Sequence, residues 1–306
     1  SRKNGSATEH PLRCLGDGGK DREKVKMEKL IINFAPTGMI PTKAMTPYVP
    51  VSVSEIVEDV HAAWEAGITM VHLHARDPRT GQLTHQKDVY AQLIEGIRAF
   101  APELIICVSL SGRNVSDVEK RAEPLDLEGR LKPDMGSLTL SSLNFNQQAS
   151  INEPDTIQKL AQTMLQKGIR PELEAFDAGM INYAKYLQRK GLLFPPFYFN
   201  LILGNIACAQ PNLLHLGVMI NDLPEGSIWS AGAVGDSQLM MNSVAIAMGG
   251  GVRVGLEDNI WYDLQRTKLA RNLDLIQRIH VLREVHGREW MTAAELRKIL
   301  RLEAGL

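Results

Sequence analysis

The sequence has few cysteines, almost no net charge and no long apolar run, and each shortage excludes a class of protein. Its three cysteines, Cys14, Cys107 and Cys208, are too scattered to form a CxxC pair, so they favour a reducing cytoplasm over a disulfide-stabilised secreted domain. A formal net charge of -1 provides no overall field for nucleic acid or an anionic membrane. No apolar run approaches the roughly 20 residues that cross a bilayer.

The first 26 residues also lack the apolar periodicity of the rest of the chain. Residues 1–26 are polar and rich in glycine and charge, without the continuous apolar stretch of a secretory signal. Met27, followed by Glu-Lys-Leu-Ile-Ile, resembles a natural start. We therefore predict that residues 1–26 are a disordered leader or an added extension, and that residues 27–306 form one catalytic domain with a C-terminal helical tail.

From residue 30 onward, short β-branched runs alternate with longer amphipathic segments, within a chain whose hydrophobic content of 44% allows a large core. The predicted strands are Leu30–Ala35, Thr69–Ala75, Leu104–Leu110, Met135–Leu140, Arg170–Phe176, Phe197–Leu203, Ile228–Ala233 and Val252–Leu256. The predicted helices are Ser54–Ala66, Asp88–Phe100, Asp155–Lys167, Gly179–Arg189, Leu239–Met248 and Leu264–His286. Eight strands separated by helices within about 260 residues predict an α/β fold, a closed (β/α)₈ TIM barrel.

Two further signals bear on this fold. A doubly wound open sheet is the alternative, but it usually has a glycine-rich turn after the first strand, where this chain has Pro36-Thr37-Gly38. At the other end, Thr292-Ala-Ala-Glu295 is a capping box, which predicts a short terminal helix added to the barrel.

Candidate metal ligands fall at the ends of two predicted strands. His72 and His74 end the second strand two residues apart, so their imidazoles point the same way. Glu257 and Asp258 follow the eighth strand and open onto the same C-terminal face, where barrel enzymes carry their chemistry. Because the second and eighth strands of a closed barrel flank the first, these residues can meet. Two imidazoles and one carboxylate with an open coordination position indicate a catalytic zinc, or another divalent transition metal.

Each motif alone has a plainer interpretation. An isolated His-x-His is more often a pair of polar residues at a barrel mouth, and Asp258 can simply cap the following helix. The coincidence of both motifs at matching strand ends favours the metal site. We interpret the remaining histidines as surface or core residues: His10, His61, His85, His215, His280 and His286.

As a set and in order, five motifs of this chain resemble the β-keto acid cleavage enzymes, the group that includes the 3-keto-5-aminohexanoate cleavage enzymes. The motifs are Val71-His-Leu-His-Ala-Arg76, Val108-Ser-Leu-Ser-Gly112, Ser142-Leu-Asn-Phe145, Pro171-Glu-Leu-Glu174 with Asp177-Ala-Gly-Met180, and Arg253-Val-Gly-Leu-Glu-Asp-Asn-Ile260. The resemblance implies a zinc-dependent barrel that converts a β-keto acid and acetyl-CoA into acetoacetate and a new acyl-CoA. It also implies a homo-oligomer, a tetramer, in the cytoplasm.

The resemblance also implies roles for individual residues. The family's metal-ligand positions correspond to His72, His74 and Glu257. The substrate-binding positions are Thr37, Ser109, Gly112, Ser142 and Glu174, and the catalytic positions are Asp258, Ser109 and Ser142. Within these sets, Ser109 and Gly112 match positions that hold the keto-acid head, and Asp258 matches the carboxylate that drives proton transfer.

The chain departs from the family pattern at two places. The member that acts on an amino-bearing acid has a glutamate where this chain has Met39 and Ile40, so recognition of an ammonium there is not supported. That member also has an arginine after the seventh strand, oriented by the aspartate, where this chain offers Asp236. Either the relay is altered or Arg113 or Arg253 contributes to it.

The implied chemistry begins with a β-keto acid chelated through its keto and carboxylate oxygens, so that the metal stabilises an enolate. Asp258 is the candidate base for the C2 proton, and the enolate attacks the thioester before a retro-Claisen cleavage. No phosphate-binding motif for CoA is evident: Gly249-Gly250-Gly251 precedes the eighth strand, which favours a turn at the bottom of the barrel.

Two other classes of function stay open. One is a metal-dependent aldolase or hydrolase on the same barrel. The fifth and sixth strand ends, which include Glu174 and Asn200, lack the histidines that amidohydrolase-like barrels need. The other is a non-catalytic barrel that binds a keto acid. One equivalent of bound metal and thioester-dependent turnover would separate the enzyme from the binding protein.

Overall fold

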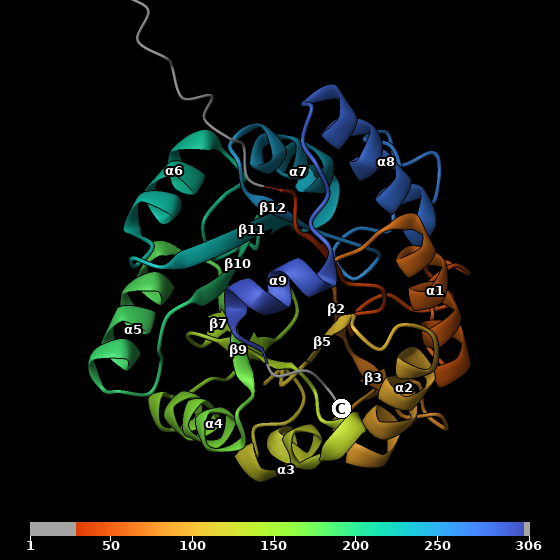
Figure 1. Ribbon diagram of the computed structural model, residues 1–306. Coiled ribbons are helices and arrows are strands. Elements are labelled where there is room, and N and C mark those ends of the chain that lie inside the picture. The colour runs from red at the N-terminus through yellow and green to blue at the C-terminus, as the bar shows by residue number, and fades with distance from the viewer. Residues whose placement is uncertain (1–28, 303–306) are drawn as a thin grey trace, which may run out of the picture.

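The computed structural model describes residues 29–302, which form a closed barrel of eight parallel strands (Figure 1). The barrel strands are β1 Ile32–Phe34, β2 Met70–Leu73, β5 Ile105–Val108, β6 Met135–Thr139, β9 Arg170–Ala175, β10 Phe197–Leu203, β11 Ser227–Ala233 and β12 Gly251–Val254. Strand β1 pairs with both β2 and β12, which closes the barrel. The predicted (β/α)₈ barrel is confirmed, whereas the prediction for residues 1–26 lies outside the described residues.

Eight of the described helices surround the barrel, and a ninth lies across the centre of their ring (Figure 1). The surrounding helices are α1 Val53–Ala66, α2 Lys87–Phe100, α3 Val118–Ala122, α4 Pro154–Lys167, α5 Ala178–Arg189, α6 Leu213–Asp222, α7 Gln238–Ala247 and α8 Asn272–Val285, and the ninth is α9 Ala293–Leu300. Short 3₁₀ turns cover Glu123–Asp126, Gly129–Leu131 and Gly235–Ser237. Two small hairpins, β3 Ala75–Arg76 with β4 Leu83–Thr84 and β7 Leu143–Asn144 with β8 Ala149–Ser150, stand outside the barrel sheet. None of the described helices has the length and apolar character that a membrane span requires.

The predicted strands coincide with the eight barrel strands, but one predicted helix is wrong at its start. The periodic segment from residue 264 becomes helical only at Asn272. Before that point, Trp261 bridges Leu269, and the Asp263 carboxylate accepts the backbone N–H groups of Thr267 and Lys268. Asp263 therefore organises a loop on the rim of the barrel rather than a helical turn.

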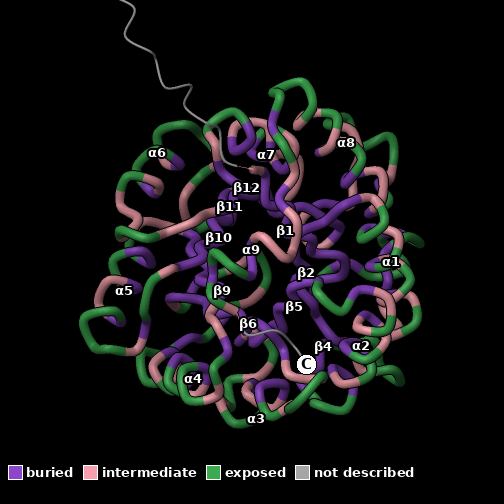
Figure 2. The backbone as a smooth tube through the Cα atoms, in the orientation of Figure 1, coloured by how far each residue is buried: buried purple, intermediate pink, exposed green. Residues whose placement is uncertain are grey.

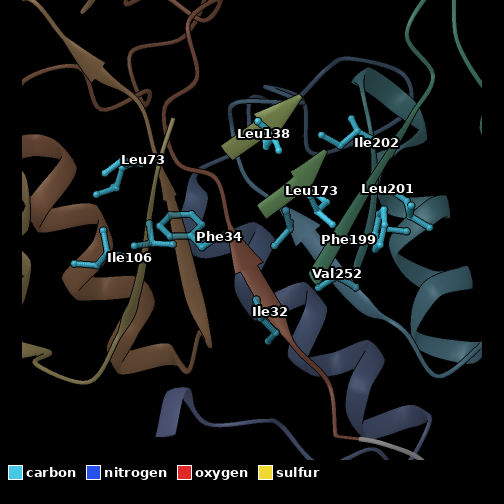
Figure 3. Close-up of a cluster of buried hydrophobic side chains, with 14 of the residues drawn as sticks. Ile32, Phe34, Leu73, Ile106, Leu138, Leu173, Phe199, Leu201, Ile202 and Val252 are labelled. Atoms are coloured by element: carbon cyan, nitrogen blue, oxygen red, sulfur yellow. The ribbon is translucent and has the colours of Figure 1, made fainter. Parts of the chain in front are cut away.

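Strand alternation separates two sets of buried side chains. Phe34, Leu73, Ile106 and Leu173 point from the strands toward the surrounding helices, in the main hydrophobic core (Figure 3). Burial is concentrated in the barrel and on the inner faces of the helices, while exposed residues lie on the outer rim (Figure 2).

The second set points into the barrel and changes character along its axis. At the N-terminal end it is apolar and includes Met70, Ile105 and Met135. Leu296 and Leu300 of α9 pack against this layer, and α9 lies across the centre of the ring of helices in Figure 1. The predicted terminal helix and its capping box are thus confirmed, and α9 closes the N-terminal end of the barrel.

The glycine-rich segment before the last strand also lies at this closed end. Gly249 to Gly251 connect α7 to β12, and the carbonyls of Gly249 and Gly250 accept hydrogen bonds from the Arg288 guanidinium. The predicted turn at the bottom of the barrel is confirmed.

Candidate active site

Inward-facing side chains become polar toward the C-terminal end of the barrel, where the predicted metal ligands meet. His74 Nε2 lies 3.1 Å from Glu257 Oε1, and His72 Nε2 lies 4.0 Å from the same oxygen. One nitrogen or oxygen from each of the three side chains lies within 4.8 Å of the others. The closed barrel produces this meeting, because β1 holds β2 on one side and β12 on the other.

Three buried atoms of this cluster have no hydrogen-bond partner among the described residues. They are His72 Nε2, His74 Nδ1 and Glu257 Oε2. Buried polar atoms are nearly always paired, so several unpaired atoms in one cluster require a reason. Two imidazole nitrogens and a carboxylate oxygen suit zinc or a related transition metal, with at least one position left open. The residues present therefore fit a divalent ion.

Gly38, in the loop after β1, passes directly against Glu257. A Cβ on Gly38 would lie 2.5 Å from Glu257 Cγ, and the Gly38 φ of +59° already favours glycine. The Gly38 carbonyl accepts a hydrogen bond of 2.9 Å from Arg76 Nε. The close approach sets the position of the Glu257 side chain relative to the paired histidines.

A buried carboxylate orients one of the histidines. His72 Nδ1 lies 2.6 Å from Glu172 Oε2, and the other Glu172 oxygen accepts hydrogen bonds from the side-chain amides of Asn33 and Asn200. Because Nδ1 is held by this carboxylate, Nε2 is the ring nitrogen of His72 that is left for the site, an arrangement common behind metal-binding histidines. The sequence motif contained Glu172, but no role was assigned to it; its inward alternation with Glu174 was the available signal.

Arg253 forms hydrogen bonds with both carboxylates that follow β12. Its Nε donates to Asp258 Oδ2 at 2.7 Å and its Nη2 donates to Glu257 Oε1 at 2.6 Å. Asp258 therefore has an arginine partner from β12, one of the two alternatives that the sequence left open. Asp236 lies elsewhere on the rim, where Arg266 Nη2 donates to it at 2.9 Å.

The pKa values of the carboxyl groups in the site are shifted in opposite directions. Burial raises the pKa of Asp258 above the usual range, with Glu257 adding to the rise and Arg253 opposing it. Burial also raises the pKa of Glu174, which accepts a hydrogen bond of 2.7 Å from Thr139 Oγ1. For Glu257, His74 and Arg253 outweigh burial and hold the pKa well below the usual range. Opposed pKa values among neighbouring acids are a mark of proton-transfer sites.

A cavity of about 660 Å³ opens over these groups. The predicted residues that line it are His74, Ser109, Glu174, Glu257 and Asp258, together with Met39 and Ile40. Residues of the cavity that had no predicted part include Thr139, Phe145 and Phe176. The strand-end rule that selected His74, applied equally to β6, would have selected Thr139.

Three predicted substrate-binding residues do not line this cavity, and their roles stay predictions. A Cβ on Gly112 would lie 2.4 Å from the Ile151 carbonyl oxygen, so close packing of the backbone accounts for this glycine. The Ser142 hydroxyl accepts a hydrogen bond of 2.8 Å from the Asn152 backbone. Thr37 is fully buried beside Gly38. Among the histidines interpreted as surface or core residues, His85 is buried, as a core residue should be.

Comparison with known proteins adds a family and named relatives. The family described as beta-keto acid cleavage enzyme matches residues 29–302. The 3-keto-5-aminohexanoate cleavage enzyme of Fusobacterium nucleatum subsp. nucleatum is 38% identical over 280 residues, which cover 90% of this chain and 99% of that protein. The 3-oxoadipate:acetyl-CoA acetyltransferase of Cupriavidus necator is 37% identical over 276 residues, which cover 89% and 94%.

Among solved structures, that of ObcA without ligand superposes with a TM-score of 0.73 at 22% sequence identity. The superposition covers 86% of this chain and 67% of ObcA. At that identity the likeness concerns the fold alone, and it agrees with the closed parallel barrel described above.

Proposed function

The chain belongs to the β-keto acid cleavage enzyme family, and from that premise we propose that it converts a β-keto acid and acetyl-CoA into acetoacetate and a new acyl-CoA. The observation that carries the proposal is the convergence of His72, His74 and Glu257 beside the Arg253–Asp258 pair. Relatives named as acetyl-CoA transferases, such as the one that uses 3-oxoadipate, support the co-substrate. The relatives are named for different β-keto acids, so their names do not identify the acid that this chain uses.

The proposed reaction balances in three steps. The β-keto acid loses a proton from C2, and C2 attacks the thioester carbonyl of acetyl-CoA, which expels the CoA thiolate. The thiolate then attacks the original keto carbon. The bond between that carbon and C2 breaks, which releases the new acyl-CoA, and C2 takes up a proton to give acetoacetate.

The ligand set would hold zinc or another divalent ion, which supplies Lewis-acid polarisation of the keto oxygen when bound. Asp258 is the proposed base for the C2 proton. Its side chain is 7% exposed, and Arg253 holds both of its oxygens, so its orientation toward the cavity is fixed. A correctly placed general base typically contributes about 10²–10⁴-fold to the rate.

Hydroxyl groups complete the proposed site. Ser109 follows β5 and lines the cavity, where its hydroxyl can donate to an oxygen that gains negative charge. One such donor is commonly worth about 3 kcal/mol of barrier. Thr139 contributes indirectly by donating to Glu174. A direct catalytic role for Ser142 stays a prediction, because its hydroxyl is engaged by the Asn152 backbone.

The decisive experiment is a screen of β-keto acids with acetyl-CoA, with acetoacetate and acyl-CoA as the products measured. We expect both products in equal amounts, and no turnover when acetyl-CoA is omitted. A hydrolase or aldolase would consume the acid without the thioester. That result would replace the proposal with the rival function.

The metal is tested separately by its stoichiometry. We expect one equivalent of divalent ion per chain, and His72→Ala should abolish its uptake while the fold, followed by circular dichroism, persists. Full activity in that variant would disprove the site. The tetramer and the cytoplasmic location implied by the resemblance are further proposals, which sedimentation and cell fractionation test.

A further inference from the structure

Three arginines line the cavity, and two of them already form ion pairs with carboxylates. Arg253 binds Asp258 and Glu257, and Arg266 binds Asp236. The third, Arg113, follows β5 and was one of the two arginines that the sequence offered as a partner of Asp258, the position in which Arg253 lies. Among residues 29–302, no side chain or carbonyl forms a hydrogen bond or an ion pair with its guanidinium. Of the three cavity arginines, Arg113 is therefore the one whose guanidinium has no anionic partner among the described residues.

An aromatic wall holds Arg113 in place. Its guanidinium carbon lies 3.2 Å from the centroid of the Phe145 ring, and Phe145 packs edge-on against Phe176 with ring centroids 5.9 Å apart. Both rings line the cavity. Stacking on a ring face stabilises a guanidinium but leaves its N–H groups free at the edge of the plane. The donors of Arg113 are consequently positioned and unused.

The charge of Arg113 persists at neutral pH. Burial lowers its pKa to about 10, with Glu257 and Asp258 opposing the drop. A partly buried cation without a paired anion is costly, and an anionic ligand would relieve that cost. Arg266, whose side chain is 57% exposed, is on the outer rim and already neutralised by Asp236.

We propose that Arg113 binds a second carboxylate at the far end of the β-keto acid, so that this chain acts on β-keto dicarboxylic acids. The inference rests on the proposed function, in which the head of the acid is held at His72, His74 and Glu257. A guanidinium fork matches a carboxylate through two parallel hydrogen bonds. A distal ammonium would instead meet the like charge of Arg113, and Met39 and Ile40 offer it no carboxylate.

A pair of matched acids tests the proposal. One is a six-carbon β-keto acid with a second carboxylate at its far end, and the other is the six-carbon β-keto acid that ends in a methyl group. With acetyl-CoA at saturation, kcat/KM from acyl-CoA formation should favour the diacid by about 10–100-fold, as expected for charge-assisted hydrogen bonds. Arg113→Gln should remove that preference, and Arg113→Lys should keep part of it.

Arg266→Gln is the matched control, since it removes another cavity arginine and should leave the ratio of the two acids unchanged. Equal losses on both acids in Arg113→Gln would overturn the inference in favour of a contact with the shared keto-acid head. A rise confined to the KM for acetyl-CoA would overturn it in favour of the co-substrate. A wild-type chain without a preference for the diacid would overturn it outright.

Measurements of acid binding distinguish a failure of this inference from a failure of the proposed function. Calorimetry with each acid and no acetyl-CoA measures two dissociation constants for the metal-loaded chain and for Arg113→Gln. Tighter binding of the diacid that disappears in the variant supports the inference even if no acid in the screen turns over. Equal binding of the two acids refutes it even if turnover is found.

Discussion

Gly38 shows how a single residue affects the positions of His72, His74 and Glu257. Because it has no side chain, the loop that contains it can pass directly against Glu257. The loop after β1 must pass within contact distance of Glu257, and its backbone at that point has a left-handed conformation. Any side chain at position 38 must displace either the loop or the carboxylate. The geometry of the proposed metal site is therefore partly determined by a residue that offers no ligand atom from a side chain.

Gly38→Ala should weaken metal binding by about 10–100-fold, the usual range for losing a group that orients a ligand. The added Cβ would lie 2.5 Å from Glu257 Cγ, so Glu257 has to move away from His72 and His74. Competition with a chromogenic chelator measures the change in affinity for zinc.

Gly81→Ala is the control for backbone strain alone. Gly81 has a φ of +68°, similar to Gly38, but a Cβ there would meet nothing within 4 Å. Its substitution should lower stability slightly and leave the metal affinity unchanged. Equal losses of metal affinity in both variants would show that strain, and not displacement of Glu257, is responsible.

The sequence allowed prediction of residues whose position follows from strand alternation and strand order. His72 and His74 share a face of one strand, and Glu257 follows a strand two places away in the closed barrel. Arg253 was named only as an alternative, since its pairing depends on how the turn after β12 folds back. The contact of Glu172 with His72 joins strands that are not neighbours, so the alternation of Glu172 with Glu174 indicates that Glu172 faces inward but does not identify its partner.

At the scale of elements, α1 shows how a local pattern determines a boundary. Ser52 accepts a hydrogen bond from the Glu55 backbone, and the Glu55 carboxylate accepts from the backbone N–H groups of Ser52 and Val51. Lys43 forms an ion pair with the same carboxylate. Burial raises the pKa of Glu55, but Lys43 and these backbone groups lower it to about 2 overall.

Glu55→Gln should therefore reduce stability in a pH-dependent way. The folded-state pKa lies below the unfolded value of about 4.3, so the carboxylate stabilises the fold above that pH and its contribution is lost as the pH falls toward 2. At pH 7 we expect a loss of about 0.5–1 kcal/mol in the free energy of unfolding. Urea denaturation at several pH values measures it.

Ser52→Ala supplies the comparison, because the hydrogen bond from the Glu55 backbone to the neutral Ser52 hydroxyl does not depend on the charge of Glu55, so most of the cap's contribution of about 1 kcal/mol should remain at low pH. A Glu55→Gln difference that does not shrink below about pH 4.3 would contradict the charge-based explanation.

Helix α6 shows where the periodic pattern fails. Its outer face exposes Leu213 and Leu214, at 70% and 73%, so apolar residues lie on more than one side. Such a segment lacks the apolar stripe by which a surface helix is recognised, and no helix was predicted there. In α3, which has only five residues, the pattern is too short to detect. The barrel strands were predictable because each is short, largely buried and separated from the next barrel strand by a longer connecting segment.

In the whole molecule, the two ends of the barrel differ in composition and in packing. The N-terminal end is closed by α9 over an apolar layer, and the C-terminal end carries the polar layer and the cavity. The buried Glu172 and its amide partners lie inside the barrel, and Glu172 contacts His72 of the proposed metal site. This division predicts that stability can be lowered at one end without altering the site at the other.

Leu300→Ala tests the division, because Leu300 is fully buried against the apolar layer beneath the site. Removing it should cost about 2–5 kcal/mol of unfolding free energy, by lost transfer energy and a residual cavity. At temperatures where the variant stays folded, its zinc affinity and the KM for the acid should equal those of the wild type. Ile299→Ala, on the 43% exposed side of the same helix, should change stability by only about 0.5 kcal/mol. A folded Leu300→Ala chain with weakened zinc binding would mean that packing at the closed end positions His72, and the two ends would then have to be treated as one unit.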